Sequence, residues 1–493
     1  MNPGTAGHAV RDPRRLRADP RRVITRLFLP GEEVPEASSR TAAVLDRILS
    51  LPEPEVATLL ADTTAGFTGR HRDLEATLLR HYQAVGHRLN RPARLSRQRQ
   101  LLIGAYFTHE YAVEAAALFN PSMVAHPDQS GMPPGQVRFV MSVRGVGEGH
   151  LSSIGFRTGR VGPGTTLSVD EVGGPLVTGT RRAPVYERAL FQAKLVDLGG
   201  DSETAAFVLD GLPARFDPAR LAQATSVLHP QLLSHPTARQ ILDQIRLVAA
   251  ASYDVEFPVD STLDERVLWP TGPTEAHGME DARFVRFVDD DQAVTYYATY
   301  TAFDGAGVAP QLLETRDFRT FHVTQLAGTA ASNKGMALFP RRLDGRFLAL
   351  SRGDGESIAL SSSPDGRCWE PAKALWGPTY GWELIQVGNC GSPVETERGW
   401  LVLTHGVGPL RTYRIGAILL DRHDPARVIA TLPEPLLAPA DDEREGYVPN
   451  VVYSCGPLLH HDVLTIPYGI SDSGIGFAHL HVAELLERML PIA

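Results

Sequence analysis

The sequence predicts a mainly β protein: a five-bladed β-propeller that carries an N-terminal α-helical segment and a helical insertion between its first and second blades. Three observations predict this fold class. Apolar strands recur along the chain at a spacing near 50 residues, a second series of turn-bearing segments keeps step with them, and two stretches of helical periodicity fall outside both series. A β-sandwich with irregular loops is the alternative, although sandwich turns usually recur every ~8–12 residues without a longer period.

The N-terminal part of the chain is expected to contain an arm followed by helices. Residues 1–40 are rich in arginine and are predicted to form a flexible, solvated arm. Over residues 41–118 apolar side chains recur at three- and four-residue steps, which is typical of amphipathic helices. Ser96 is a candidate N-cap for a helix that runs through Tyr106 to Ala115.

Residues 119–480 are expected to form the propeller. Four of the five predicted apolar strands start 52, 54 and 63 residues apart. In the second series, the steps from Ala282 to Pro340, Pro393 and Pro449 are 58, 53 and 56 residues. The predicted strands are 137–141, 294–298, 346–350, 400–404 and 463–467. The second series consists of 120–122, 281–283, 338–340, 391–393 and 448–450. Two series in step, each with five members, predict five blades.

A surplus of roughly 110 residues separates the first and second copies of the repeat. We expect an insertion there, at about residues 166–277, with a helical island between Asp217 and Ser252. Asp217 and Ser234 are candidate N-caps within it. Residues 481–493 are predicted to form a C-terminal helix.

The composition is ordinary for a soluble protein, with a net charge of -9. No run approaches the roughly 18 apolar residues of a membrane span, and the N-terminus lacks the apolar core of a signal peptide, so we expect a cytoplasmic protein. The charge argues against nucleic acid as a partner. Neither the cysteines Cys368, Cys390 and Cys455 nor the pair His460 and His461 have a metal-ligand spacing, so we expect no metal and no cofactor.

The segment from Gly278 to Phe284, with the sequence GMEDARF, compresses two acids and a guanidinium into four positions. If it is extended, side chains alternate between faces, so that Asp281 and Arg283 share one face while Glu280 points to the other. A general acid must hold its proton, which burial favours and a neighbouring arginine opposes. From these residues alone, a surface ion pair at a strand end is the competing interpretation.

Equivalent strand ends of a propeller converge on its axis, so the residues that follow the five predicted strands are candidates for a shared funnel. They are Arg144, Thr301, Arg352, His405 and Tyr468. Three of the five can be cationic. Lys334, one of only three lysines against 45 arginines, and Arg283 add to this character, which is typical of a site for an anion such as phosphate. Asp472 is either a ligand for sugar hydroxyls or a turn former.

The order of these motifs resembles that of glycoside hydrolase family 130, the mannoside phosphorylases and mannosidases, over about residues 119–477. The motifs are FNP at 119–121, EDAR at 280–283, NK at 333–334, SR at 351–352, HG at 405–406, GYVPN at 446–450 and YG at 468–469. The resemblance implies a five-bladed propeller, in agreement with the repeat count made independently of it.

By this resemblance, the reaction inverts the anomeric centre: inorganic phosphate is the co-substrate, a short β-mannoside is cleaved and α-mannose 1-phosphate is released. Asp281 is implied as the general acid, whose proton travels through a sugar hydroxyl. The implied phosphate-binding residues are Lys334, Arg352, His405 and Arg283. The implied substrate-binding residues are Asn120, Arg144, Glu280, Asn333, Tyr447, Asn450, Tyr468 and Asp472. We expect β-mannooligosaccharide and phosphate as partners, neither nucleic acid nor a membrane, and a homo-oligomer contact through the helical N-terminal region.

Two departures from the family pattern keep alternatives open. Ala282 replaces the usual proline, and the loop after Arg352 contains Asp354 and Glu356 where many phosphorylases have a proline. Inverting hydrolysis needs a second carboxylate about 6.5–9.5 Å from the acid to activate water. Since Asp354 or Glu356 could act as this base, a β-mannosidase that uses water is the first alternative, and a sugar-binding propeller without catalysis is the second.

Overall fold

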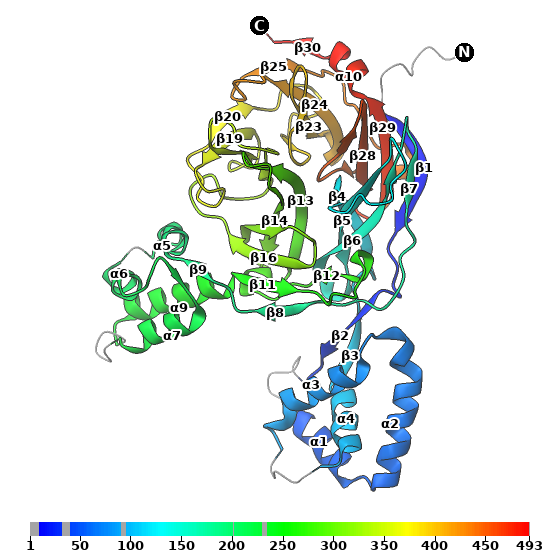
Figure 1. Ribbon diagram of the computed structural model, residues 1–493, viewed down its shortest axis with the longest axis vertical. Coiled ribbons are helices and arrows are strands. Elements are labelled where there is room, and N and C mark those ends of the chain that lie inside the picture. Colours follow the sequence, from blue (N-terminus) through cyan, green and yellow to red (C-terminus); the bar gives the residue numbers. More distant parts are fainter. Residues whose placement is uncertain (1–8, 32–39, 90–94, 201, 229–233, 493) are drawn as a thin grey trace.

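The computed structural model describes residues 9–31, 40–89, 95–200, 202–228 and 234–492. Most of its strands form one β-rich body, and most of its helices gather in two groups outside that body (Figure 1). The N-terminal group lies below the body in this view, and the group contributed by the insertion projects from its side. The mainly β prediction is therefore confirmed.

The largest sheet has eleven strands and consists of two antiparallel groups that are joined at one point. The junction is a single parallel pair between Gly278 and Ser152. Gly278 has a φ of +129°, and a Cβ atom there would lie 2.3 Å from the Ser152 hydroxyl, so only glycine fits. Along the sheet the strands are β4 (Ala117–Ala125), β5 (Val137–Val146), β6 (Ser152–Val161), β13 (Gly278–Val288), β14 (Val294–Phe303), β15 (Val308–Thr315), β16 (Thr320–Gln325), β11 (Tyr253–Glu256) and β8 (Thr180–Arg182), while β12 (Val267–Leu268) and β7 (Leu167–Val169) pair with β6.

Three further sheets complete the body. The first contains β17 (Ala337–Leu338), β18 (Phe347–Ser351), β19 (Ile358–Ser363) and β20 (Lys373–Trp376). The second contains β21 (Gln386–Asn389), β22 (Val394–Thr396), β23 (Gly399–Gly408), β24 (Thr412–Leu420), β25 (Val428–Thr431) and β30 (Leu490–Pro491). The third contains β1 (Val10–Arg17), β26 (Val452–Tyr453), β27 (Leu458–His460), β28 (Val463–Ile470) and β29 (Gly474–His481).

The five strands predicted from the sequence all fall in these sheets. They overlap β5, β14, β18, β23 and β28, each of which pairs with its neighbours in antiparallel fashion. Closure of the sheets into five blades around one axis remains a prediction.

Buried apolar side chains pack neighbouring sheets against one another. The Trp400 ring on β23 meets the Phe339 ring, which follows β17, edge to face with 5.1 Å between centroids. All ten residues of β23 are buried, which is the pattern of a strand covered on both faces. The strand that carries His405 is therefore one of the most enclosed in the protein.

The prediction of a flexible arm over residues 1–40 is wrong where the structure describes this region. Strand β1 pairs with β29, and β2 (Val23–Leu27) pairs with β3 (Thr108–Ala112). The arginines are not simply solvated, because Arg11 and Arg15 bind the buried Glu443 carboxylate at 2.9 and 3.0 Å. Partners more than 400 residues away in the sequence supply this order, and a local pattern does not reveal them.

In the part of the N-terminal region that the structure describes, four helices form one group, and the last of them ends earlier than residue 118. They are α1 (Arg40–Ser50), α2 (Glu53–Phe67), α3 (Leu74–Gly86) and α4 (Arg97–Tyr106). Ser96 caps α4 as predicted, since its side chain accepts a hydrogen bond from the Arg99 amide. The predicted continuation to Ala115 is wrong because the chain turns after Tyr106 and enters β3, where pairing with β2 overrides the helical spacing.

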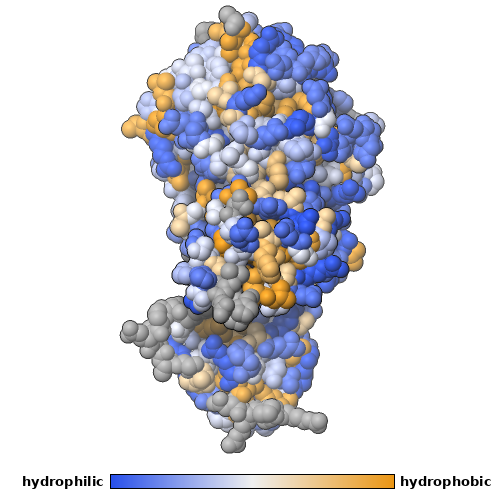
Figure 2. Space-filling model, turned by 90° about the vertical axis from the view of Figure 1, so that its left-hand side faces the viewer, coloured by the Kyte–Doolittle hydropathy of each residue, from blue (hydrophilic) through white to orange (hydrophobic). Residues whose placement is uncertain are grey.

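The insertion contributes a second helical group, which starts earlier than the predicted island. Its helices in the described residues are α5 (Arg188–Asp197), α6 (Glu203–Asp210), α7 (Pro218–Ser226) and α9 (Pro236–Ala250). A short antiparallel pair joins β9 (Tyr186–Glu187), which precedes α5, to β10 (Arg215–Phe216), which precedes α7. Asp217 caps α7 as predicted, because its side chain accepts from the Arg220 amide. The prediction for Ser234 is wrong, because the N-cap position of α9 is His235 and Pro236 starts the helix. Figure 2 looks onto this side of the molecule and shows apolar side chains scattered among polar ones.

A last helix, α10 (Val482–Arg488), falls within the predicted C-terminal segment and is followed by β30. None of the helices in the described residues is both long and apolar enough to cross a membrane.

Candidate active site

Two β-bulges shape the site that the sequence predicts. The pairing of β4 with β5 shifts register between Phe119 and Ser122, and that of β13 with β14 shifts between Glu280 and Arg283. The residue inside each bulge has a left-handed backbone, which Asn and Asp tolerate better than most residues. The φ angle is 50° at Asn120 and 55° at Asp281.

The bulge in β13 corrects the prediction that Glu280 and Asp281 face opposite sides of the strand. An extended strand alternates its side chains, but a left-handed residue interrupts that alternation. Both carboxylates line one pocket as a result. Arg283, which was expected to share a face with Asp281, is only 2% exposed and lies behind it.

This pocket has a volume of about 210 Å³ and brings together residues from all four large sheets or the loops between their strands. Eight of the residues that the sequence analysis singled out line it: Asn120, Arg144, Glu280, Asp281, Lys334, Arg352, His405 and Asp472. They come from segments as far apart as residues 120 and 472. The strand ends and motif positions therefore converge.

Asp281 is held by a neutral hydrogen-bond donor and by positively charged side chains. Its Oδ1 accepts a hydrogen bond from the Asn120 amide, and its Oδ2 lies 3.5 Å from Arg283 Nη2. Burial raises the pKa of this carboxyl, but the positive charges of Arg283, Arg144 and Lys334 lower it. The Asn120 hydrogen bond acts in the same direction, and the net pKa lies below its ordinary value.

Glu280 neutralises two of the neighbouring cations. Its Oε1 accepts from Arg144 Nη2 at 2.7 Å, and its Oε2 accepts from Lys334 Nζ at 2.7 Å. Such charge-assisted contacts fix both cationic groups at the pocket wall. Glu280 therefore organises the cations beside Asp281.

Asp472 has the opposite electrostatic character to Asp281. Burial raises the pKa of its carboxyl to about 6, and the negative charges of Asp281 and Glu280 add to this effect. Arg144 and Arg411 oppose it only in part. The pocket thus combines a carboxyl with a lowered pKa and another with a raised pKa.

Arg352 and His405 form a second polar pair in the wall. Arg352 Nη1 donates to His405 Nε2 at 3.1 Å, which requires a neutral imidazole as acceptor. Burial lowers the pKa of His405 well below its ordinary value, and the charges of Arg352 and Arg283 lower it further. His405 is therefore a neutral ring at physiological pH and can donate a hydrogen bond from Nδ1.

Buried polar atoms without a hydrogen-bond partner concentrate around this pocket. Among the described residues they include Asn120 Oδ1, Arg144 Nε, Arg352 Nε and His405 Nδ1. Leaving such an atom unpaired costs about 1–3 kcal/mol, so their accumulation is typical of a functional site.

The remaining predicted residues lie outside the pocket lining. Tyr468 is buried and donates to Glu443 at 2.6 Å, while Tyr447 is half exposed and its hydroxyl lies 2.9 Å from His150 Nδ1. The Asn450 side chain accepts from Arg444. Asn333 has a left-handed backbone and does not reach the lining.

Neither of the two acids proposed as an alternative base lines the pocket. Asp354 Oδ1 accepts hydrogen bonds from the backbone amides of Glu356 and Ser357, each at 2.9 Å, so its carboxylate closes its own turn. Glu356 accepts from the Val387 amide through its backbone carbonyl.

Several residues of the lining were not predicted from the sequence. They are Phe119, Gln386, Arg411, Tyr413, Val448, Val451 and Tyr453. Phe119 and Val448 lie inside motifs quoted above, and Val451 directly follows the motif at 446–450. Arg411 and Tyr413 follow His405 across a tight hairpin, so the turn after β23 was the signal that could have found them.

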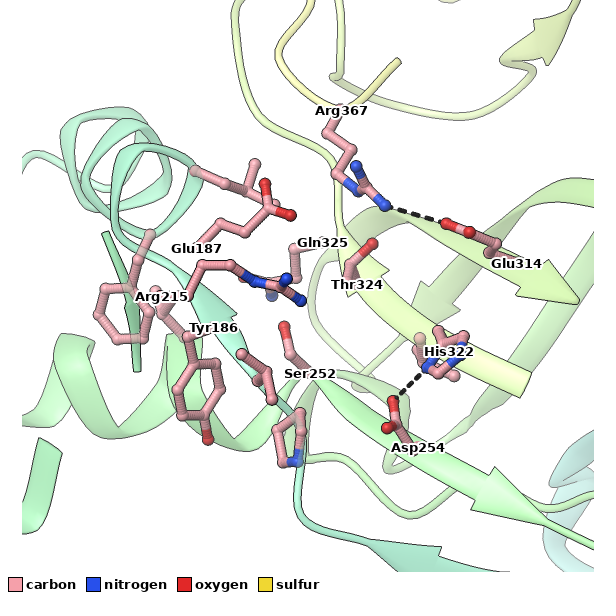
Figure 3. Close-up of a pocket in the computed structure, with 16 residues that line it drawn as sticks. Tyr186, Glu187, Arg215, Ser252, Asp254, Glu314, His322, Thr324, Gln325 and Arg367 are labelled. Atoms are coloured by element: carbon pink, nitrogen blue, oxygen red, sulfur yellow. Dashed lines mark hydrogen bonds and ion pairs between the residues drawn. The ribbon is translucent and has the colours of Figure 1, made fainter. Parts of the chain in front are cut away.

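A second pocket, of about 260 Å³, lies between the helical insertion and the edge of the largest sheet (Figure 3). His322 Nδ1 lies 2.8 Å from Asp254 Oδ1, and Arg367 Nη2 donates to Glu314 at 2.9 Å. No residue predicted for the site belongs to the described residues that line it.

The family model and the relatives that match this chain are described as mannoside phosphorylases. The family described as beta-1,4-mannooligosaccharide phosphorylase matches residues 243–490. A beta-1,2-mannobiose phosphorylase from Listeria innocua is 34% identical over 46% of this chain and 65% of its own length. A 1,2-beta-oligomannan phosphorylase from Thermoanaerobacter sp. is 33% identical over 45% of this chain and 75% of its own length.

A third relative, a beta-1,4-mannooligosaccharide phosphorylase from Ruminococcus albus, is 31% identical over 41% of this chain and 63% of its own length. The alignments thus span about two thirds of the length of these relatives. A solved structure of the beta-1,2-mannobiose phosphorylase from Listeria innocua, in complex with beta-1,2-mannobiose, aligns with a TM-score of 0.45 and 23% identity over 76% of this chain and 92% of that chain.

Proposed function

Since this chain belongs to glycoside hydrolase family 130, we propose that it is an inverting phosphorylase that cleaves short β-mannosides with inorganic phosphate and releases α-mannose 1-phosphate. One observation carries the proposal: Asp281 shares a pocket of about 210 Å³ with Lys334, Arg352 and His405. An acid beside a set of cations and hydrogen-bond donors is what phosphorolysis requires. The relatives that match this chain are named as mannoside phosphorylases, which supports the same reaction class.

The proposed reaction has a simple balance of bonds and protons. A phosphate oxygen forms the bond to the anomeric carbon as the glycosidic bond breaks. The proton of Asp281 reaches the leaving oxygen, through a sugar hydroxyl if the mechanism follows the family resemblance, and Asp281 becomes a carboxylate. Phosphate arrives as an anion and needs no general base, so one acid and a cationic site suffice.

The chain's own charges are suited to this sequence of events. In the absence of ligand, Arg283, Arg144 and Lys334 lower the pKa of Asp281. Phosphate bound at Lys334 would offset part of this positive charge and let Asp281 take up the proton that catalysis needs. The acid would thus become competent only when the nucleophile is bound.

We extend the proposal to the fold: the four large sheets close into a five-bladed propeller around this pocket. The eleven-stranded sheet supplies two blades, since its two antiparallel groups meet only at the Gly278–Ser152 pair. The four-, six- and five-stranded sheets supply one blade each. The lining residues then lie at the blades' converging ends.

The decisive experiment incubates β-1,2-, β-1,3- and β-1,4-mannobiose with the protein, with and without phosphate, and separates mannose from mannose 1-phosphate. The proposal expects mannose 1-phosphate from at least one substrate, and only when phosphate is present. Asp281→Asn should lower the rate by about 10²-fold or more while circular dichroism stays unchanged. Release of free mannose without phosphate would instead favour a β-mannosidase, and binding without turnover would favour a sugar-binding propeller.

A further inference from the structure

Arg411 stands at the tip of the hairpin that joins β23 to β24 and is one of the residues that line the pocket. The hairpin is strained, because both Leu410 and Arg411 have left-handed backbones, with φ angles of 57° and 55°. For residues other than glycine such a conformation costs roughly 1 kcal/mol or more each. Leu410 is 89% exposed, so burial of its side chain does not offset the free-energy cost of this backbone conformation.

Three of the other cations of the site already have partners within the protein, whereas the fourth, Arg352, donates to the neutral His405 ring and has no carboxylate partner among the described residues. Arg144 and Lys334 each bind Glu280 at 2.7 Å. Arg283 is buried and donates to Tyr453 at 2.6 Å and to the Asp281 carbonyl at 3.0 Å. These groups have their charges compensated within the protein, or lie behind the pocket wall.

Arg411 differs from these three, Arg144, Lys334 and Arg283, in two respects. Its side chain is exposed at the mouth of the pocket, and among the described residues no carboxylate lies within ion-pair distance of its guanidinium. Its charge nevertheless reaches the site, because it is one of the groups that lower the pKa of Asp472 against the effect of burial. A free guanidinium at a pocket entrance attracts anions and can bind phosphate through two parallel hydrogen bonds.

We propose that Arg411 captures the phosphate co-substrate at the mouth of the pocket and remains bound to it beside Arg352 and Lys334. This assignment rests on the proposed phosphorylase function and adds a residue to it. It explains why the chain maintains a strained turn at this position. An uncharged mannoside gains little from an unpaired positive charge, so the effect of Arg411 should fall on phosphate rather than on sugar.

The test compares Arg411→Gly with the parent protein. Glycine keeps the left-handed backbone without strain, so the variant removes the guanidinium and preserves the turn. Arg411→Lys restores the charge without the two parallel hydrogen bonds. Arg414→Gln is the matched control, because Arg414 lies on β24 three residues further along and does not line the pocket.

Phosphate binding is measured by titration calorimetry, and the Michaelis constants for phosphate and for mannobiose are measured at low and high salt. In Arg411→Gly we expect the dissociation constant for phosphate to rise about fivefold to tenfold and to lose much of its salt dependence. Arg411→Lys should recover part of the affinity for phosphate. The Michaelis constant for mannobiose should change by less than about twofold in every variant.

Two results would overturn the role of Arg411 but leave the proposed function intact. One is an unchanged affinity for phosphate in Arg411→Gly. The other is a Michaelis constant that rises more for mannobiose than for phosphate. A parent protein that binds no phosphate would overturn the proposed function and this assignment together. Thermal unfolding of each variant shows that the turn has folded.

Discussion

The side-chain amide of Asn120 donates a hydrogen bond to Oδ1 of Asp281, and both residues have left-handed backbones inside β-bulges. The two bulged strands are also tied together next to this contact, since Ser122 Oγ accepts from the Phe284 amide at 3.0 Å. The acid therefore does not sit on a regular strand. Two coupled irregularities, one in β4 and one in β13, set its position.

The first prediction concerns Asn120. Asn120→Gly keeps the left-handed backbone but removes the amide that stabilises the Asp281 carboxylate, so the pKa of Asp281 should rise. A general acid works only while it is protonated. The alkaline limb of the pH profile for kcat/KM should therefore move to higher pH, with a lower maximal rate because the acid is less well oriented. Asn120→Ala is the control for backbone strain: it should behave similarly but unfold at a lower temperature.

An Asn120→Gly profile whose alkaline limb coincides with that of the parent would show that the amide does not act on the acid. If the alkaline limb of Asn120→Gly is unshifted and its Tm is lower than that of the parent, Asn120 supports only the fold.

The sequence predicted the strands and much of the pocket, because both depend on local patterns repeated along the chain. It did not predict that Glu280 and Asp281 share a pocket, since a bulge leaves only a weak signal: Asn and Asp at the bulged positions tolerate positive φ, but many other residues of these types do not adopt it. Tyr468 was expected at the site because it follows a repeated strand. It turns instead to Glu443, a partner that no local pattern reveals.

The second prediction links phosphate to a proton. The cations around Asp281 lower its pKa, and bound phosphate should offset part of their charge. Phosphate binding at pH 5.5 should therefore be accompanied by proton uptake. Calorimetry in two buffers with different ionisation enthalpies measures this uptake directly. The uptake should decrease in Asp281→Asn, which leaves the ionisation of phosphate itself unchanged, and equal values in the two proteins would contradict the link.

The third prediction concerns the acids of the loop after Arg352. Asp354→Asn and Glu356→Gln should each keep phosphorolysis within about twofold of the parent, because neither side chain lines the pocket and Asn can still accept hydrogen bonds in the turn. Product analysis checks both the rate and the ratio of mannose to mannose 1-phosphate. A large loss of mannose release in either variant would restore the hydrolytic alternative.

The fourth prediction tests how β1 is attached. Glu443 is 1% exposed and binds Arg11, Arg15 and the Tyr468 hydroxyl, so Glu443→Gln leaves two partly buried guanidinium groups without a counter-charge. The free energy of unfolding should fall by about 2–3 kcal/mol, less than for fully buried pairs because both arginines keep some contact with water. Hydrogen exchange in β1 should accelerate most. Glu484→Gln, on the exposed side of α10, is the control and should stay within about 0.5 kcal/mol of the parent.

Asp472 should make stability depend on pH. Burial and the charges of Asp281 and Glu280 raise its pKa to about 6 in the folded protein. A raised pKa means that the folded state binds the proton more tightly than the unfolded state, so the associated stability is fully present below about pH 4 and is lost as pH rises through 6. Asp472→Asn keeps a residue that tolerates the φ of 50° and removes the charge. Its free energy of unfolding should exceed that of the parent by about 1–3 kcal/mol at pH 8, with no difference near pH 4.

Urea unfolding at both pH values measures this difference in the free energy of unfolding. A gain that is equal at pH 4 and pH 8 would show that the Asp472 carboxyl is not the cause. If Asp472 binds the mannosyl unit, the stabilised variant should also have a higher KM for mannobiose, because it lacks the carboxylate that contacts the sugar. The same carboxylate would then destabilise the folded protein and bind the substrate.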